Sequence, residues 1–258
     1  MGYNFCNPFL KFSSKRYPAP PRAREINTSL TAQNIRTLNY LSKVLDKKWL
    51  THDVIQLSIE KPATYKYHVG QAVEIFLDKD TESLKTPFTL TSIPEKDEEL
   101  RFIIKVYPEH RGLTLALSKL KVNNSISITE AWDSFTYNGK GVFIAAGSGI
   151  TPFIPMLRIL KEQNHISGHS LIYANKKKQD IILHDELKEI LGNKFLNILS
   201  RDHLSQYAYG RIDFSFLKAN ILDINQNFYL CGPDGFLQSV KQHLMNLGVE
   251  ENLIQTIS

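Results

Sequence analysis

The segment Gly141–Leu160, which reads GVFIAAGSGITPFIPMLRIL, constrains the fold of this chain more than any other segment. Val142–Ala146 is a short apolar run, which is typical of a buried strand in a parallel sheet. The glycine turn at 147–149 ends that strand. Thr151 and Pro152 are then a predicted helix start, with Thr151 as the capping residue. A strand, a glycine turn and a helix N-terminus together favour a pyrophosphate site, because backbone N–H groups and the helix dipole attract an anion.

This turn also has a purely structural interpretation. It lacks the third glycine of the Gly-x-Gly-x-x-Gly dinucleotide motif, since Pro152 stands at that position. Many strand-to-helix turns carry glycine for steric reasons alone, so this segment by itself leaves both interpretations open.

Length and composition limit the possible functions. A chain of 258 residues fits two modest domains. It has no apolar window of about 18 residues, so we expect no membrane span. Cys6 and Cys231 have no Cys-x-x-Cys spacing, which excludes a four-cysteine iron–sulfur cluster and a disulfide framework and favours a cytoplasmic location. The eight histidines show no ligand spacing, so no metal is predicted.

The net charge of +5 is concentrated at the N-terminus. Residues 1–36 hold six Lys or Arg against one Glu, so the remaining chain is balanced, which argues against a nucleic-acid partner. Pro8, Pro18, Pro20 and Pro21 break helices, and this segment is predicted to be an irregular basic arm. Two other interpretations stay open for it: an organelle-targeting segment and a docking site for an acidic partner.

Residues 37–138 show the alternating pattern of β-strands and are predicted to form an antiparallel barrel domain. The expected strands are Asp53–Glu60, Gln71–Leu77, Phe88–Ile93, Arg101–Tyr107 and Ser125–Thr129. One amphipathic helix is expected over Leu113–Leu120, just after Gly112.

Residues 139–258 alternate strands with helices, which predicts an α/β domain with a parallel sheet. The expected strands are Val142–Ala146, Leu171–Ala174, Phe195–Leu199 and Phe228–Cys231, and the expected helices are Pro152–Gln163, His184–Leu191 and Asp234–Leu247. Gly248 stands where the last helix should end. A ligand is expected where the carboxyl ends of these strands meet the barrel.

Four short motifs follow one another in the chain: Thr86–Ser92, His110–Thr114, the turn Gly147–Pro152 and Tyr229–Gly235. In this order they resemble the ferredoxin–NADP reductase family of flavoprotein reductases, and the resemblance covers about Leu38–Ser258. It implies a six-stranded antiparallel β-barrel that binds FAD, followed by an α/β domain that binds NAD(P).

The first motif, TPFTLTS, resembles the flavin-binding strand of the family. The resemblance implies that Phe88, next to Pro87, lies against the isoalloxazine ring, and that Thr89 donates a hydrogen bond to flavin N5. Thr86 replaces the arginine with which the family holds a flavin phosphate. Lys85 is adjacent and cationic but lacks the two-pronged geometry of arginine, so a weaker affinity for flavin is expected.

The second motif resembles the family's loop for the flavin pyrophosphate, which favours FAD over FMN. Gly112 and Thr114 match this loop, with Leu113 between them at the helix start, where backbone N–H groups suit a phosphate. The resemblance also puts Lys105 on the strand that passes along the flavin. A solvated surface lysine is an equally open alternative for Lys105.

The third motif resembles the dinucleotide-binding turn of the family. Gly147, Gly149, Thr151 and Pro152 match it, and the resemblance puts Thr151 near the flavin and nicotinamide rings. Asp133 lies in the preceding loop and departs from the family, which commonly has glycines there.

The fourth motif, YLCGPDG, contains the family's Cys-Gly-Pro sequence. The resemblance implies that Cys231 lies beside nicotinamide C4, that Gly232 permits close approach, and that Pro233 opens the next helix. A buried cysteine is also common as an inert small apolar residue, so a structural role for Cys231 is the alternative.

Ser200 and Arg201 follow a predicted strand, where NADP-using members of the family place a Ser-Arg pair on the ribose 2′-phosphate. Tyr209 and Arg211 follow at a suitable distance, and Asn175–Lys178 adds cations. NADPH is therefore the expected hydride donor, and NADH is the alternative.

The resemblance implies an enzyme that moves hydride from NADPH to FAD, with catalytic roles for Thr89, Thr151 and Cys231. The expected acceptor of the electrons is a separate small carrier protein, ferredoxin or flavodoxin. An oxygenase component, a free flavin and ferric iron are the alternatives. Because Thr86 and Asp133 depart from the family, a non-enzymatic flavin-binding subunit or partner-binding module also stays open. A monomer is expected.

Overall fold

The computed structural model describes residues 39–77 and 86–257, which belong to one compact unit, Thr37–Ser258. The predicted basic arm 1–36, with Cys6, and the predicted flavin contact Lys85 lie outside the described residues. None of the helices within the described ranges combines the length and the apolar character needed to cross a bilayer.

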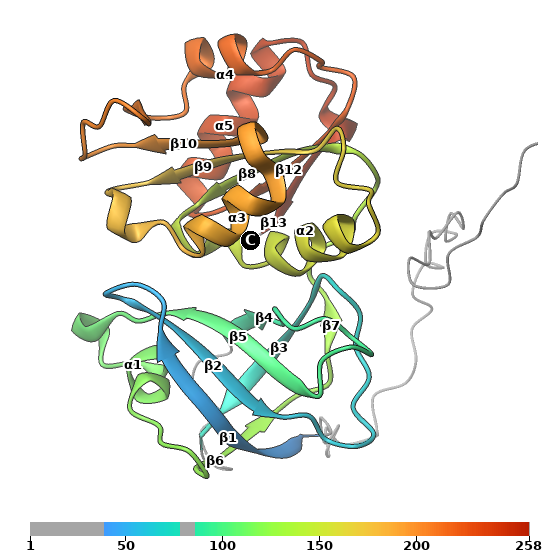
Figure 1. The fold of residues 1–258 in the computed structure, drawn as a ribbon, viewed down its shortest axis with the longest axis vertical. Coiled ribbons are helices and arrows are strands. Elements are labelled where there is room, and N and C mark those ends of the chain that lie inside the picture. Colours follow the sequence, from blue (N-terminus) through green and yellow to red (C-terminus); the bar gives the residue numbers. More distant parts are fainter. Residues whose placement is uncertain (1–38, 78–85, 258) are drawn as a thin grey trace, which may run out of the picture. The chain divides into compact units, whose positions relative to one another are not determined.

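In the described residues, the N-terminal part is an antiparallel sheet with the strand order β4-β3-β6-β1-β2-β5 (Figure 1). Its strands are β1 (Tyr40–Trp49), β2 (Val54–Glu60), β3 (Gln71–Phe76), β4 (Pro87–Thr89), β5 (Glu99–Lys105) and β6 (Ser125–Ile128), with the short β7 (Trp132–Asp133) paired to β3. The two end strands meet, because the Thr91 N–H just after β4 donates to the Arg101 carbonyl of β5 at 2.8 Å. The predicted six-stranded antiparallel barrel is confirmed.

The barrel interior is filled by alternate side chains of its strands. Ile55, Leu57 and Ile59 of β2 are each fully buried in one apolar cluster. A short helix, α1 (Leu113–Ser118), starts directly after Gly112 as predicted and adds Leu117 to the same cluster. The barrel therefore has an apolar core of its own. The alternate side chains of its strands point outward, where polar residues can be presented.

The C-terminal part is a parallel sheet with the strand order β11-β10-β9-β8-β12-β13, as the predicted α/β fold requires. Its strands are β8 (Gly141–Ala146), β9 (Ser170–Asn175), β10 (Phe195–Leu199), β11 (Ala208–Tyr209), β12 (Asn227–Cys231) and β13 (Ile254–Ile257). Its helices are α2 (Phe153–Glu162), α3 (His184–Leu191), α4 (Phe214–Asn220) and α5 (Asp234–Asn246). Short 3₁₀ turns lie here at Gly147–Ile150, Lys178–Asp180, Gly192–Lys194 and Glu251–Leu253, and the barrel part has one at Pro108–His110.

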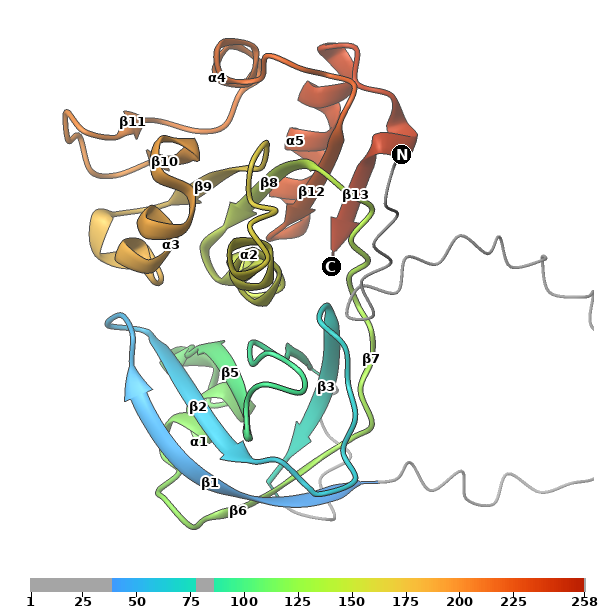
Figure 2. The same cartoon turned by 45° about the vertical axis from the view of Figure 1, so that its right-hand side comes forward.

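Helices cover both faces of this sheet (Figure 2). Phe143 of β8 belongs to a core shared with α2 and α3, whereas its neighbour Ile144 belongs to a core shared with α4 and α5. Because β8 is buried on both faces, its sequence is a continuous apolar run rather than an alternating one.

The short strands β7, β11 and β13 and helix α4 were not predicted, and β1 and β4 differ from the prediction for local reasons. β1 was not predicted as a separate strand, because a bulge between Val44 and Asp46 breaks its alternation. β4 ends at Thr89 instead of Ile93, because the chain turns there and the Ile93 N–H donates to the Asp97 carboxylate at 2.6 Å.

The start of α2 also differs. The predicted capping role of Thr151 is wrong, because no side chain caps this helix and Thr151 itself has helical backbone angles. The 3₁₀ turn at Gly147–Ile150 comes first, and Pro152 stands immediately before the helix. The 3₁₀ turn and α2 therefore follow one another without a break after the carboxyl end of β8.

Candidate active site

A cavity of about 880 Å³ lies at the carboxyl ends of the parallel strands, against one side of the barrel. Residues from the ends of β8, β9, β10, β12 and β13 line it, and so do residues of β2, β3, β4 and β5. This is the edge at which the sequence predicts a ligand, and the volume is at the upper end of the range for small-molecule sites.

Most of the predicted site residues line this cavity. The three predicted catalytic residues, Thr89, Thr151 and Cys231, are among them. The other predicted residues in the lining are Pro87, Lys105, Gly147, Gly149, Pro152, Ser200, Arg211, Gly232 and Pro233. The motifs Thr86–Ser92 and Tyr229–Gly235 lie far apart in the chain, yet both contribute residues to the lining of the same cavity.

Phe88 is placed differently from its neighbours. Its side chain is 7% exposed and packs in the barrel core. Alternate residues of a strand point to opposite faces, so Pro87 and Thr89 line the cavity while Phe88 turns away from it. The ring contact predicted for Phe88 has no counterpart in the cavity lining.

Arg201 and Tyr209 are also outside the cavity lining, and both are exposed. The ring of Tyr209 is 58% exposed and lies 4.9 Å from that of His203. Of the predicted 2′-phosphate residues, the structure therefore brings Ser200 and Arg211 to the cavity and leaves Arg201 and Tyr209 on the surface.

The predicted pyrophosphate loop forms a second hollow, of about 500 Å³, on the barrel. Gly112 lines it together with Arg111 and Lys119. Leu113 packs against the barrel core, and the Thr114 hydroxyl accepts the Tyr107 N–H at 3.4 Å. Since Tyr107 lines the main cavity, this hydrogen bond links the loop to it.

The glycine turn fits directly against the Cys-Gly-Pro motif. A Cβ atom on Gly149 would lie 2.3 Å from the Cys231 carbonyl oxygen, so only glycine allows this approach. Gly147 has a φ of +54°, which favours glycine, and its carbonyl accepts the hydroxyl of the fully buried Tyr173 at 2.8 Å. Gly149 is therefore sterically required, and the turn also forms a wall of the cavity. Its role as a pyrophosphate site stays a prediction.

Cys231 is half-buried and is a free thiol. Burial raises the pKa of the Cys231 thiol to about 12, although a backbone hydrogen bond from Gly232 opposes this rise. The thiol is therefore neutral at physiological pH, so it is not a thiolate nucleophile in the resting protein.

Lys105 is held by a carboxylate instead of being a freely solvated lysine. Its Nζ donates to Asp53 Oδ2 at 2.5 Å, and its side chain is 28% exposed. Burial alone would raise the pKa of Asp53, but the hydrogen bond and charge of Lys105 outweigh it and lower the pKa. His52 lies 3.7 Å from both Asp53 and Asp180, so this group also reaches the parallel-sheet side of the cavity.

Polar and cationic groups gather at the ends of β9 and β10. Lys176 and Asn175 line the cavity there together with Ser200 and Arg211. The Asn175 amide nitrogen is buried and has no hydrogen-bond partner among the described residues. A buried donor without a partner favours a bound acceptor, so this end suits the polar part of a nucleotide.

Several cavity residues were not predicted. Tyr107 follows Lys105 by two positions, and the alternation of β5 could have indicated it. Ile257 lines the cavity from β13, next to Cys231 of β12, and carries no sequence signal because β13 itself was not predicted. The described residues contain no group of three His, Cys, Asp or Glu side chains placed to hold a metal ion.

Comparison with known proteins identifies both halves of the chain. Residues 39–155 match the family model of an FAD-binding domain, and residues 143–242 match that of an oxidoreductase NAD-binding domain. The chain belongs to the ferredoxin–NADP reductase family. The predicted enzyme class is thereby confirmed: this reductase is a flavin-dependent NAD(P)H oxidoreductase.

Named relatives of the reductase differ in their partners. Human NADH-cytochrome b5 reductase 1 is 25% identical, over 83% of this chain and 84% of its own length. The reductase component of propane 2-monooxygenase from Mycolicibacterium goodii is 24% identical, over 81% of this chain and 63% of that protein.

Solved structures share the fold of the reductase. The flavohem-like FAD/NAD-binding domain of nitric oxide dioxygenase from Vibrio cholerae O1 biovar El Tor has a TM-score of 0.73 and 24% identity, covering 84% of this chain and 96% of that one. At 24% identity, this likeness shows a shared fold alone.

The residues of the reductase fit the two cofactors that its domains imply. The barrel wall offers the Thr89 hydroxyl and the Lys105 ammonium, and the opposite wall offers the glycine turn and the unpaired Asn175 amide. These are donors for the carbonyl, phosphate and ring-nitrogen acceptors of nucleotides.

Proposed function

We propose that the reductase takes hydride from NADPH onto FAD and passes the electrons, one at a time, to a separate carrier protein. The observation that carries this proposal is the single cavity shared by Thr89, the turn Gly147–Pro152 and Cys231. Bound FAD supplies the ring that accepts a hydride and releases electrons singly. Residues 37–138 are the proposed flavin-binding domain and residues 139–258 the proposed nicotinamide-binding domain.

The chain's own residues have distinct proposed roles. The Thr89 hydroxyl would donate a hydrogen bond to flavin N5, and Pro87 would contact the ring in place of Phe88. The neutral thiol of Cys231 would pack beside the nicotinamide, with which it can make close van der Waals contact. Thr151 lines the cavity from the turn and would contact the reacting rings there. The hollow at Gly112, with Arg111 and Lys119, suits the flavin diphosphate because it carries two cations.

Colour is the direct test of this function. The purified protein, supplied with FAD, is expected to be yellow and to bleach when NADPH is added without oxygen. A protein that binds no FAD, or a yellow protein that neither NADPH nor NADH bleaches, would contradict the proposal and leave a partner-binding module.

NADPH is the proposed donor rather than NADH, although several relatives are named for NADH. Lys176, Arg211 and Ser200 line one end of the cavity, and such a group suits a 2′-phosphate dianion. Asp180 is the one carboxylate among the described lining residues, and it already accepts the Lys177 N–H at 2.9 Å.

The ratio of kcat/KM for NADPH over NADH is expected to be at least about tenfold. Ser200→Asp puts a carboxylate beside the 2′ position, which repels a phosphate and accepts a hydroxyl, so this ratio should fall by about tenfold or more. Lys218→Ala is the matched control, because Lys218 is an exposed lysine of α4 outside the cavity lining. Equal kcat/KM values for NADPH and NADH in the unmodified protein would contradict the proposed preference for NADPH.

The electron acceptor is proposed to be a small one-electron carrier such as ferredoxin or flavodoxin. The relatives named for cytochrome b5 and for a monooxygenase make a haem protein and an oxygenase component the competing acceptors. The rate at which the NADPH-reduced protein reduces each purified carrier ranks the candidate acceptors. Free flavin and ferric citrate are the comparison acceptors.

A further inference from the structure

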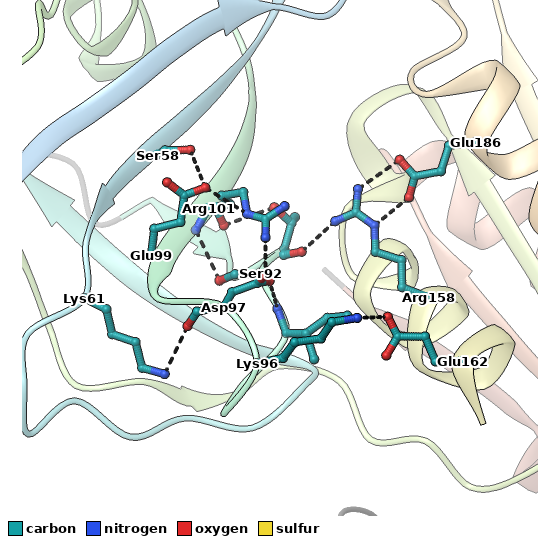
Figure 3. Close-up of polar contacts among 12 residues, drawn as sticks. Ser58, Lys61, Ser92, Lys96, Asp97, Glu99, Arg101, Arg158, Glu162 and Glu186 are labelled. Atoms are coloured by element: carbon teal, nitrogen blue, oxygen red, sulfur yellow. Dashed lines mark hydrogen bonds and ion pairs between the residues drawn. The ribbon is translucent and has the colours of Figure 1, made fainter.

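Arg158 is a charged side chain of α2 that reaches the barrel (Figure 3). Its Nε and Nη2 donate to the two carboxylate oxygens of Glu186 on α3, at 2.5 and 3.0 Å. Its Nη1 donates to the Thr91 carbonyl at 3.0 Å, and its side chain is only 17% exposed. One guanidinium thus joins α2, α3 and the segment that follows barrel strand β4.

The barrel end of this contact is firmly held. Thr91 is 1% exposed, and its N–H and hydroxyl both donate to the Arg101 carbonyl, at 2.8 and 3.0 Å. Thr91 lies two residues after Thr89, which lines the cavity. Any shift of the Thr91 carbonyl therefore shifts the strand that presents Thr89.

The other end of the contact belongs to the opposite wall of the cavity. Helix α2, which carries Arg158, continues directly from the turn Gly147–Pro152. A helix moves as a rigid rod over this length, so the position of Arg158 is coupled to the position of the turn.

Other contacts between these two parts are weaker or less directional, and the 3.7 Å approach of His52, whose side chain is 54% exposed, to Asp180 is one of them. Val54 and Ile103 of the barrel join the apolar core of α2 and α3, and apolar contact is non-directional. Lys96 and Glu162 form a second ion pair, but their side chains are 58% and 45% exposed, so its contribution is small. The bidentate pair with Glu186 holds the largely buried Arg158 guanidinium in one orientation, and its single hydrogen bond to the Thr91 carbonyl is therefore a directional contact between the two parts.

We propose that Arg158 is a positioning residue for hydride transfer, because its hydrogen bond to the Thr91 carbonyl sets the separation of the Thr89 strand and the Gly147–Pro152 turn. This inference rests on the proposed function. Hydride transfer needs reacting atoms about 3–3.5 Å apart, and a misplacement of about 1 Å can cost on the order of 100-fold in rate.

Arg158→Lys is the variant that tests this role. Lysine keeps the charge opposite Glu186, but one ammonium cannot reproduce the bidentate pair and the bond to Thr91 together. The FAD-loaded full chain is mixed with saturating NADPH without oxygen, and the loss of flavin absorbance is followed. The limiting rate is expected to fall about 10- to 30-fold, with unchanged flavin content and an unchanged urea midpoint.

Two further measurements separate positioning from a merely structural role. NADPH deuterated at the transferred position should give the Lys variant a primary isotope effect at least as large as that of the unmodified protein, because hydride transfer then limits the rate. Lys96→Met, which removes the exposed ion pair between the same two parts, should stay within about twofold of the unmodified rate.

If Arg158→Lys does not fold, Glu186→Gln is measured instead, with an expected three- to tenfold loss because Arg158 keeps only part of its support. Unmodified rates in the measured variant, or a slowed reaction whose isotope effect falls toward one, would overturn the positioning role. An unmodified protein that neither nucleotide bleaches would instead overturn the proposed function, and the positioning role with it.

Discussion

Gly149→Ala is expected to lower the rate of flavin reduction by NADPH by about 100-fold. The added Cβ would lie 2.3 Å from the Cys231 carbonyl oxygen and 2.6 Å from its carbon, both of them backbone atoms that cannot rotate away. The turn and the Cys-Gly-Pro motif must then separate by about an ångström, which is enough for a loss of this size. Overpacking at this contact should also cost about 1–3 kcal/mol of unfolding free energy.

Gly235→Ala is the matched control for this effect. Gly235 also lies by the cavity, in α5, but a Cβ there meets no atom within 4 Å. Its substitution should leave the unfolding free energy unchanged or raise it by about 0.5–1 kcal/mol. Urea unfolding measures the stability of both variants, and anaerobic flavin reduction measures their activity. A Gly149→Ala protein that equals the Gly235→Ala protein in both assays would show that the close approach is unimportant.

Cys231→Ala is expected to slow flavin reduction by about 10- to 100-fold while the protein keeps its FAD. The Cys231 side chain lines the cavity from β12, next to Gly232, and its loss leaves a gap where the nicotinamide should be held. The limiting rate with saturating NADPH and the flavin-to-protein ratio are the two measurements. An unchanged rate would show that Cys231 is a structural residue only.

The pH dependence of Cys231 tests its ionisation state. Burial raises the pKa of this thiol to about 12 in the folded protein, against about 8.5 for an exposed cysteine. Between pH 7 and about 9.5 the folded protein keeps a neutral thiol, so the reduction rate should show no thiol ionisation there.

Stability should respond to pH with a definite sign. Below about pH 8.5 the thiol is neutral in both states, and its full contribution to stability is present. Above that pH the unfolded chain ionises first, so stability falls as pH rises toward 12. Cys231→Ala should lack this part of the fall, and urea unfolding at pH 7.5 and 9.5 compares the two proteins. An equal loss of unfolding free energy between pH 7.5 and 9.5 in the unmodified and the Cys231→Ala protein would contradict the raised pKa of the thiol.

Strong local patterns made much of the fold predictable. The bounds of α3, His184–Leu191, and of β10, Phe195–Leu199, agree with those expected from the sequence, because each segment has a clear period and a clear end. β1 and β13 were missed, since a bulge interrupts one and the other is short and partly polar. The four motifs also led to the family and to its two classes of cofactor.

The geometry of the site was not predictable in the same way. The sequence could not tell that Phe88 turns into the core while Thr89 faces the cavity, nor that Asp53 holds Lys105. It offered no indication of Arg158, whose hydrogen bond to Thr91 spans 67 residues, just as the Asp53–Lys105 bond spans 52.

The sequence by itself determined most of the helices and strands, the succession of an antiparallel and a parallel sheet, and the chemical class of the enzyme, because period, turn residues and short motifs are local properties. Only the tertiary structure decided which side chains share the cavity and which merely border it. That choice depends on strand register and on close contacts between distant segments, such as Gly149 against the Cys231 carbonyl, and no local pattern encodes them.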